Sequence, residues 1–216
     1  MTRTRERTVA TTWGKTRIEA LSDGVFAIAI TLLVLDIRIP DLERPVSNAD
    51  AWHAIRAVGP TLASFLITFV LSGSYWFMHH ATFHSIRSVT RPIAMLNLPF
   101  LMFVSLLPFS TSLLGKLGLV HPVALAVYFS NQLALALSLN LLWLIARRHG
   151  LIEEPLPDPT MRFVIGAQPI GCLAAMAAIA VNPMASYWVY LFVAIAARRI
   201  ARRRFKPLRA DAPAPL

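Results

Sequence analysis

The chain has 216 residues, of which 56% are hydrophobic and only 15% are charged, and its mean hydropathy is +0.58. A soluble domain carries about 25% charged residues, so this composition excludes an ordinary soluble protein and indicates a membrane protein. The net charge of +10 raises nucleic acid as a partner, so the position of the basic residues along the chain must decide between nucleic acid and a membrane.

Six apolar stretches, each a predicted transmembrane helix, follow one another along the chain. They run over 21–37, 58–78, 92–114, 122–145, 163–181 and 184–197. Proline marks the turns between them, as at His121-Pro122. The sequence therefore predicts an all-α, polytopic membrane protein with six transmembrane helices. We place its parts at 1–16 (cytoplasmic basic N-terminus), 17–203 (six-helix transmembrane domain) and 204–216 (cytoplasmic disordered tail).

The basic residues fall mainly on one side of the membrane when the six spans alternate in direction. Seventeen of the 21 Lys and Arg residues lie on the side that holds both termini, and the other side has only Arg38, Arg44, Arg56 and Lys116. By the positive-inside rule we expect both termini to be cytoplasmic, in a multi-pass protein of the cell membrane. The tail also suits anionic lipid headgroups, so the charge gives no reason to assign nucleic acid as a partner.

The first apolar segment, RIEALSDGVFAIAITLLVLDI at 17–37, is too short and too polar for a helix that faces lipid. About twelve residues separate its two aspartates, or about 18 Å of helix, against a hydrocarbon core of about 30 Å. Such a helix suits surroundings of protein or of pore water. Both of its faces are apolar, so periodicity does not choose between them, and the Thr31 hydroxyl could simply bond back to its own backbone.

Polar side chains from three spans reach one depth near the cytoplasmic side. Arg17, Ser22 and Asp23 lie at the start of the first span, His79 lies near the end of the second, and Asn97 lies near the start of the third. A carboxylate inside a membrane needs partners, and His and Asn side chains can supply donors. We therefore expect Asp23, His79 and Asn97 to hydrogen-bond in one polar network that includes Ser22, with Arg17 near the carboxylate.

His80 and His84 allow another interpretation, because side chains at i and i+4 of a helix can hold a metal ion. Such pairs recur by chance, and neither a cysteine nor a second carboxylate cluster supports this one, so we assign no metal. A role in sensing pH stays open.

The sequence gives weaker support to other functional classes. HExxH, GxSxG and GxxxxGK[ST] are absent, so no enzyme activity is predicted. A secondary transporter or proton-coupled carrier could use the intramembrane Asp and His, but it would normally show an internal repeat, and 110–216 has no convincing second ALSDG pattern. A helical scaffold with a basic, lipid-binding tail is the plainest rival.

Three stretches carry a resemblance to a known family: RIEALSDG at 17–24, YWFMHHATF at 75–83 and LNLPFLMFVSLLPFSTSLLG at 96–115. Together they resemble the transmembrane protein 175 family of potassium channels, whose signature is RxxxFSDG. Leu21 replaces the phenylalanine of that signature and loses an aromatic contact but no polar chemistry. The resemblance implies a potassium-favouring cation channel that needs no cofactor beyond the permeant K+. Because the chain has one repeat, it also implies a homotetramer whose first helices line a central pore.

The resemblance also implies roles for four residues of the first helix. The apolar constriction of the family falls on Ile28, its pore-lining threonine falls on Thr31, and further apolar rings fall on Leu32 and Leu35. A ring of four Ile28 side chains would form a narrow neck that closes by dewetting, while Thr31 would offer hydroxyl oxygens to a partly dehydrated cation.

Overall fold

A computed structural model describes residues 14–42, 44–153 and 158–205, and within these ranges the regular structure is helical. The elements are α1 (Lys15–Leu32), the 3-10 helix η1 (Leu33–Asp36), α2 (Asn48–Ala57), α3 (Gly59–His84), α4 (Arg91–Ser105), α5 (Leu107–Leu117), α6 (Pro122–Arg148), α7 (Pro159–Ile179) and α8 (Pro183–Arg204). The predicted all-α fold class is confirmed. Most of the basic N-terminus and of the predicted tail lies outside the described residues.

Six helical segments of the described chain are long and apolar enough to cross a membrane, when η1 is counted with α1, α2 with α3, and α4 with α5. This confirms the predicted number of spans and makes the chain a multi-pass membrane protein. The last segment is longer than predicted, since α8 continues from 197 to Arg204. Arginine favours helix, and its long side chain lets the charge reach the membrane surface while the stem covers apolar surface.

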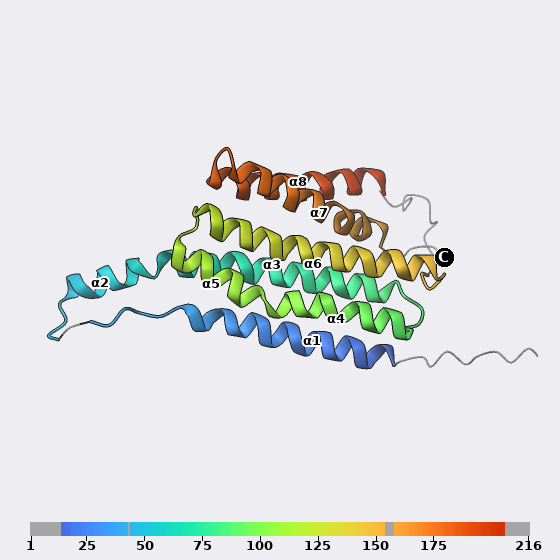
Figure 1. The fold of residues 1–216 in the computed structure, drawn as a ribbon, viewed down its shortest axis with the longest axis horizontal. Coiled ribbons are helices and arrows are strands. Elements are labelled where there is room, and N and C mark those ends of the chain that lie inside the picture. The colour runs from blue at the N-terminus through green and yellow to red at the C-terminus, as the bar shows by residue number, and fades with distance from the viewer. Residues whose placement is uncertain (1–13, 43, 154–157, 206–216) are drawn as a thin grey trace, which may run out of the picture.

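The loop after the first span contains α2, a helix that the hydropathy pattern does not predict because the segment is not apolar. It begins with a capping box. The Ser47 hydroxyl accepts a hydrogen bond from the Asp50 amide at 3.2 Å, and the Asp50 carboxylate accepts one from the Ser47 amide at 3.0 Å. These reciprocal bonds satisfy amides that a helix start leaves free. In Figure 1, α2 extends beyond the end of the bundle.

The third span, predicted as one helix over 92–114, is divided into α4 and α5 at Leu106. Pro108 stands at the start of α5 and has no amide to donate to the carbonyl of Val104, so the regular bonding of α4 ends there. Pro99, in contrast, lies inside α4. The break lets α5 pack against α3 and η1 while α4 packs against α1 and α6.

The helices are ordered across the bundle so that α1 lies along one edge and α8 along the other (Figure 1). α1 packs against α3 and α4, α6 packs against α4 and α7, and α8 packs against α7. The central core includes Phe26, Tyr75, Phe100 and Leu135, from α1, α3, α4 and α6. One side of α1 is therefore covered by its own chain, and its other side has no neighbour among the residues that the structure describes.

Candidate functional site

The two faces of α1 and η1 have opposite surroundings. Phe26 and Leu33 are each 2% exposed, whereas Ile28 is 61% and Leu35 is 60% exposed. Residues three or four apart share a helix face, and the buried set packs on α3 and α4. The structure thus makes a choice that periodicity could not: Ile28, Thr31, Leu32 and Leu35, the four predicted pore residues, all lie on the uncovered part of the helix. Their role in a pore stays a prediction.

The Thr31 hydroxyl bonds to its own backbone, and the residue also lies on the uncovered side of the helix. Its Oγ1 donates to the carbonyl oxygens of Ala27 and Ile28, each at 2.9 Å, so the hydroxyl bonds back to its own helix. The residue is nevertheless exposed and does not belong to the core. Because the proton is used inside the helix, the lone pairs of the oxygen are free to face a cation.

The polar network of three helices is present around Asn97, which is 1% exposed. Its Nδ2 donates to the Ser22 hydroxyl at 3.0 Å, and its Oδ1 lies 2.9 Å from Nε2 of His79. The His79 ring stacks on Phe83 and Phe100, with centroids 4.4 and 5.1 Å away. Ser22, Asn97 and His79 therefore join α1, α4 and α3 at one level, and all three side chains are buried.

Asp23 is not part of that network, so the expectation that it bonds to His79 and Asn97 is wrong. Its Oδ1 instead accepts a hydrogen bond from Nε1 of Trp76 at 2.8 Å. Successive residues of an α-helix point about 100° apart, so when Ser22 faces α4 the next side chain must turn away from it. Within the described residues no ion pair joins Arg17 to Asp23, and both side chains are exposed.

His80 and His84 lie on the exposed surface of α3, with ring centroids 6.4 Å apart. His80 also stacks against Trp76 at 6.1 Å. In the part of the chain that the structure describes, no group of three His, Cys, Asp or Glu side chains could hold a metal ion. Trp76 was not predicted as the partner of Asp23, although its place one turn before His79 and His80 on α3 was a usable signal.

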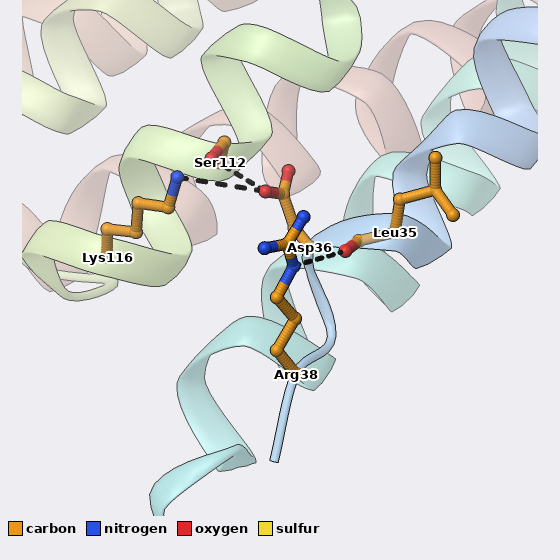
Figure 2. Close-up of polar contacts among 5 residues, drawn as sticks. All are labelled: Leu35, Asp36, Arg38, Ser112 and Lys116. Carbon is orange, nitrogen blue, oxygen red and sulfur yellow. Dashed lines mark hydrogen bonds and ion pairs between the residues drawn. The ribbon is translucent and has the colours of Figure 1, made fainter. Parts of the chain in front are cut away.

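The C-terminal end of the first span has polar contacts for which the sequence predicted no role (Figure 2). Oδ1 of Asp36 accepts a hydrogen bond from the Ser112 hydroxyl at 3.1 Å and lies 3.8 Å from Nζ of Lys116. Nε of Arg38 donates to the carbonyl of Leu35 at 3.3 Å. The two Asp36 contacts tie η1 to α5 at the level where the exposed apolar face of the helix ends, and the Arg38 contact is local to the end of η1.

Comparison with known proteins identifies the family. A sequence model described as the endosomal/lysosomal potassium channel TMEM175 matches residues 17–108. A potassium channel of Streptomyces collinus is 38% identical over 160 residues, which cover 70% of this chain and 76% of that relative. The chain belongs to the TMEM175 family. The resemblance seen in the sequence is confirmed, and the chain is an ion channel and not an enzyme.

Other members of the TMEM175 family are similar to this chain in structure or in sequence. The crystal structure of a TMEM175 homologue from Chamaesiphon minutus, described as a lysosomal potassium-selective channel homologue, superposes with a TM-score of 0.71. It is 32% identical, and the match covers 87% of this chain and 97% of the other. Human TMEM175, named an endosomal/lysosomal proton channel, is 38% identical over 99 residues, which are 44% of this chain and 20% of the human protein.

Proposed function

We propose that the chain is a potassium-selective cation channel that conducts K+ passively along the exposed face of its first helix. The observation that carries this proposal is the one-sided covering of α1 and η1. Their buried face is held by the chain itself, whereas Ile28 and Leu35 are each about three-fifths exposed and belong to none of the core clusters of the described residues. The span is long enough to cross a membrane, but its apolar run between Asp23 and Asp36 covers only about 18 Å of a core of about 30 Å, so water or protein suits this face better than lipid.

One helix cannot enclose a conduit, so the proposal requires several copies around an axis. We propose a homotetramer, in which four α1 helices turn their exposed faces inward and the remaining helices pack outside them. The single six-helix repeat supports this assembly, and the potassium channel names of the bacterial relatives support the conduit that it would enclose. A second copy of the chain is therefore the main protein partner, and each copy contributes one quarter of the pore wall.

The chemistry of the exposed face suits a narrow, partly apolar conduit. A ring of Ile28 side chains gives the constriction, and such a ring gates by excluding water when its diameter falls. Thr31, one turn farther out, presents hydroxyl oxygens whose protons are already used within the helix. Leu32 and Leu35 continue the apolar wall towards the outer end. Selectivity by this route should be looser than in a filter of carbonyl oxygens, because fewer dipoles replace the hydration shell.

Recording in planar bilayers under opposing K+ and Na+ gradients tests this function. Discrete current steps are expected, with a reversal potential close to the equilibrium potential of K+. Ile28→Asn should widen and wet the neck, which raises conductance and weakens the preference for K+. Ile170→Asn is a matched control, because Ile170 is 63% exposed but lies on α7, away from α1. Wild-type currents from Ile28→Asn, or equal changes in both variants, would refute the neck.

Proton transport is the second candidate. The vertebrate relatives are named proton channels. His79 is a titratable side chain within a membrane span, where it is hydrogen-bonded to Asn97. The same residue could serve a proton-coupled carrier. A reversal potential that follows an imposed pH gradient rather than the K+ gradient would favour proton conduction, and small, saturable flux without current steps would favour a carrier.

The cell membrane is the proposed location, with both termini in the cytoplasm and anionic lipids near the basic tail. The distribution of Lys and Arg supports this orientation. Labelling of introduced cysteines in intact cells tests it, because the native Cys172 is buried. Asp41→Cys should react with an impermeant thiol reagent from outside, and Arg87→Cys should react only after permeabilisation. The reverse pattern would invert the topology.

A further inference from the structure

A groove of about 900 Å³ lies between α3 and α8, and α7 contributes to its wall. No residue of α1 lines it, so it is separate from the proposed pore. Its rims are exposed apolar side chains, Val70 and Phe77 on α3 and Trp188 and Leu191 on α8, with exposures between 46% and 67%. The groove exists because α8 packs along α7 and leaves its other apolar stripe without a packed helix in the described part of the chain.

The groove is longer than the hydrocarbon of one membrane leaflet is deep. On α8 its lining runs from Met184 to Arg198 at intervals of three and four residues, which keeps the lining residues on one face. Fourteen residues of helix span about 21 Å. The hydrocarbon of one leaflet is about 15 Å deep, half of a core of about 30 Å. An acyl chain that enters at the Arg198 end is therefore covered by groove over its whole length.

The charge of the groove is confined to that same end. Arg198 is the one charged residue in the lining, which contains no Asp or Glu. Arg202 follows one turn later on the same side of α8, in its basic last turn. A second copy of this chain in the same membrane would place its own basic residues at the same depth. The repulsion between like charges therefore disfavours a second copy as the occupant of the groove. A phosphate group carries the complementary charge.

We propose that this groove binds one anionic phospholipid of the cytoplasmic leaflet. The phosphate pairs with Arg198 and Arg202, and an acyl chain lies between α3 and α8 along Val70, Phe77 and Leu191. A bound lipid would fill the space that the chain leaves open and hold the α7–α8 pair against the rest of the bundle. The site uses the membrane orientation proposed above, but it does not depend on which ion the channel conducts.

Native mass spectrometry of the full-length, delipidated protein tests the site. The probes are phosphatidylglycerol and phosphatidylcholine with the same acyl chains, titrated separately. The wild type should retain phosphatidylglycerol preferentially, and Arg198→Gln should weaken that binding about fivefold, since an arginine near anionic lipid contributes about 1 kcal/mol. Arg203→Gln is the matched control, because five residues of helix turn Arg203 about 140° away from Arg198. Equal retention of both lipids, or equal effects of the two variants, would overturn the site.

A second pair of variants tests the apolar part of the groove. Ala194→Trp should fill it and lower phosphatidylglycerol retention, whereas Ala177→Trp, at an exposed position of α7 outside the groove, should not. If Ala194→Trp instead dissociates the oligomer and leaves lipid retention unchanged, a second copy occupies the groove and the proposal is wrong. Loss of the lipid preference alone, with K+ currents intact in the bilayer, would overturn this site and leave the channel function standing.

Discussion

Replacing Asn97 by leucine should destabilise the bundle by an amount that its contacts define. The side chain is 1% exposed and bridges Ser22 and His79 with bonds of 3.0 and 2.9 Å. Each hydrogen bond between membrane helices contributes about 0.6 kcal/mol on average. Leucine also leaves the ring nitrogen of His79 buried without a partner, which costs about 1–3 kcal/mol. We therefore expect a loss of about 2–4 kcal/mol, equivalent to a fall in Tm of about 4 °C or more for a chain of this size.

Thermal denaturation of the purified assembly, followed by size-exclusion chromatography, measures this loss. Ser22→Ala should cost less, because it removes one bond between helices and one bond within α1, to the Ile18 carbonyl, and leaves the His79 contact in place. The double variant should lose little beyond Asn97→Leu alone, because the bond between helices that Ser22→Ala removes is already absent there. Ser105→Ala is a control on α4, since its hydroxyl bonds only within its own helix. Additive losses, or an unchanged Tm for Asn97→Leu, would refute a shared network.

Four further variants probe other contacts through the same Tm measurement. Trp76→Phe removes the donor to Asp23 and should cost about 1–2 kcal/mol; an unchanged Tm would mean that this bond contributes nothing. Gly115→Ala should destabilise, because its Cβ would lie 3.1–3.2 Å from α3, whereas Gly166→Ala meets no atom within 4 Å and should gain up to about 1 kcal/mol of helix propensity. Equal effects of the two glycine variants would contradict the close approach of α5 to α3. Lys116→Gln should cost less than about 1 kcal/mol, since the lysine is 71% exposed, and a larger loss would show a stronger ion pair.

The sequence was sufficient for the membrane fold because its signals are long and repeated. Six apolar stretches separated by proline predict six spans, and the structure has six such segments. Two features were missed for local reasons. The polar helix α2 depends on a capping box at Ser47, which a hydropathy pattern does not register. The break between α4 and α5 depends on Pro108, yet Pro99 lies within a helix, so proline alone does not locate a break.

The sequence predicted the depth at which the site residues lie in the membrane, but not the direction in which each side chain points from its helix. Alternating spans placed Ser22, Asp23, His79 and Asn97 at one level, and the structure brings three of them together. Which of two neighbouring residues faces α4 is decided by the packing of the whole helix, including the 2% exposed Phe26, and no local pattern contains that information. The same packing turns Asp23 towards Trp76 and leaves the proposed pore face uncovered.

Cysteine accessibility along α1 during single-channel recording tests the central claim most directly. Cys172 is buried, so the wild type should be insensitive to an aqueous thiol reagent. If the uncovered face lines the conduit, the reagent should block Thr31→Cys and Leu35→Cys channels. It should leave Ala29→Cys and Leu33→Cys unaffected, because those positions are 3% and 2% exposed and face the bundle. Block of the second pair, or no block of the first pair, would contradict a pore lined by the first helix.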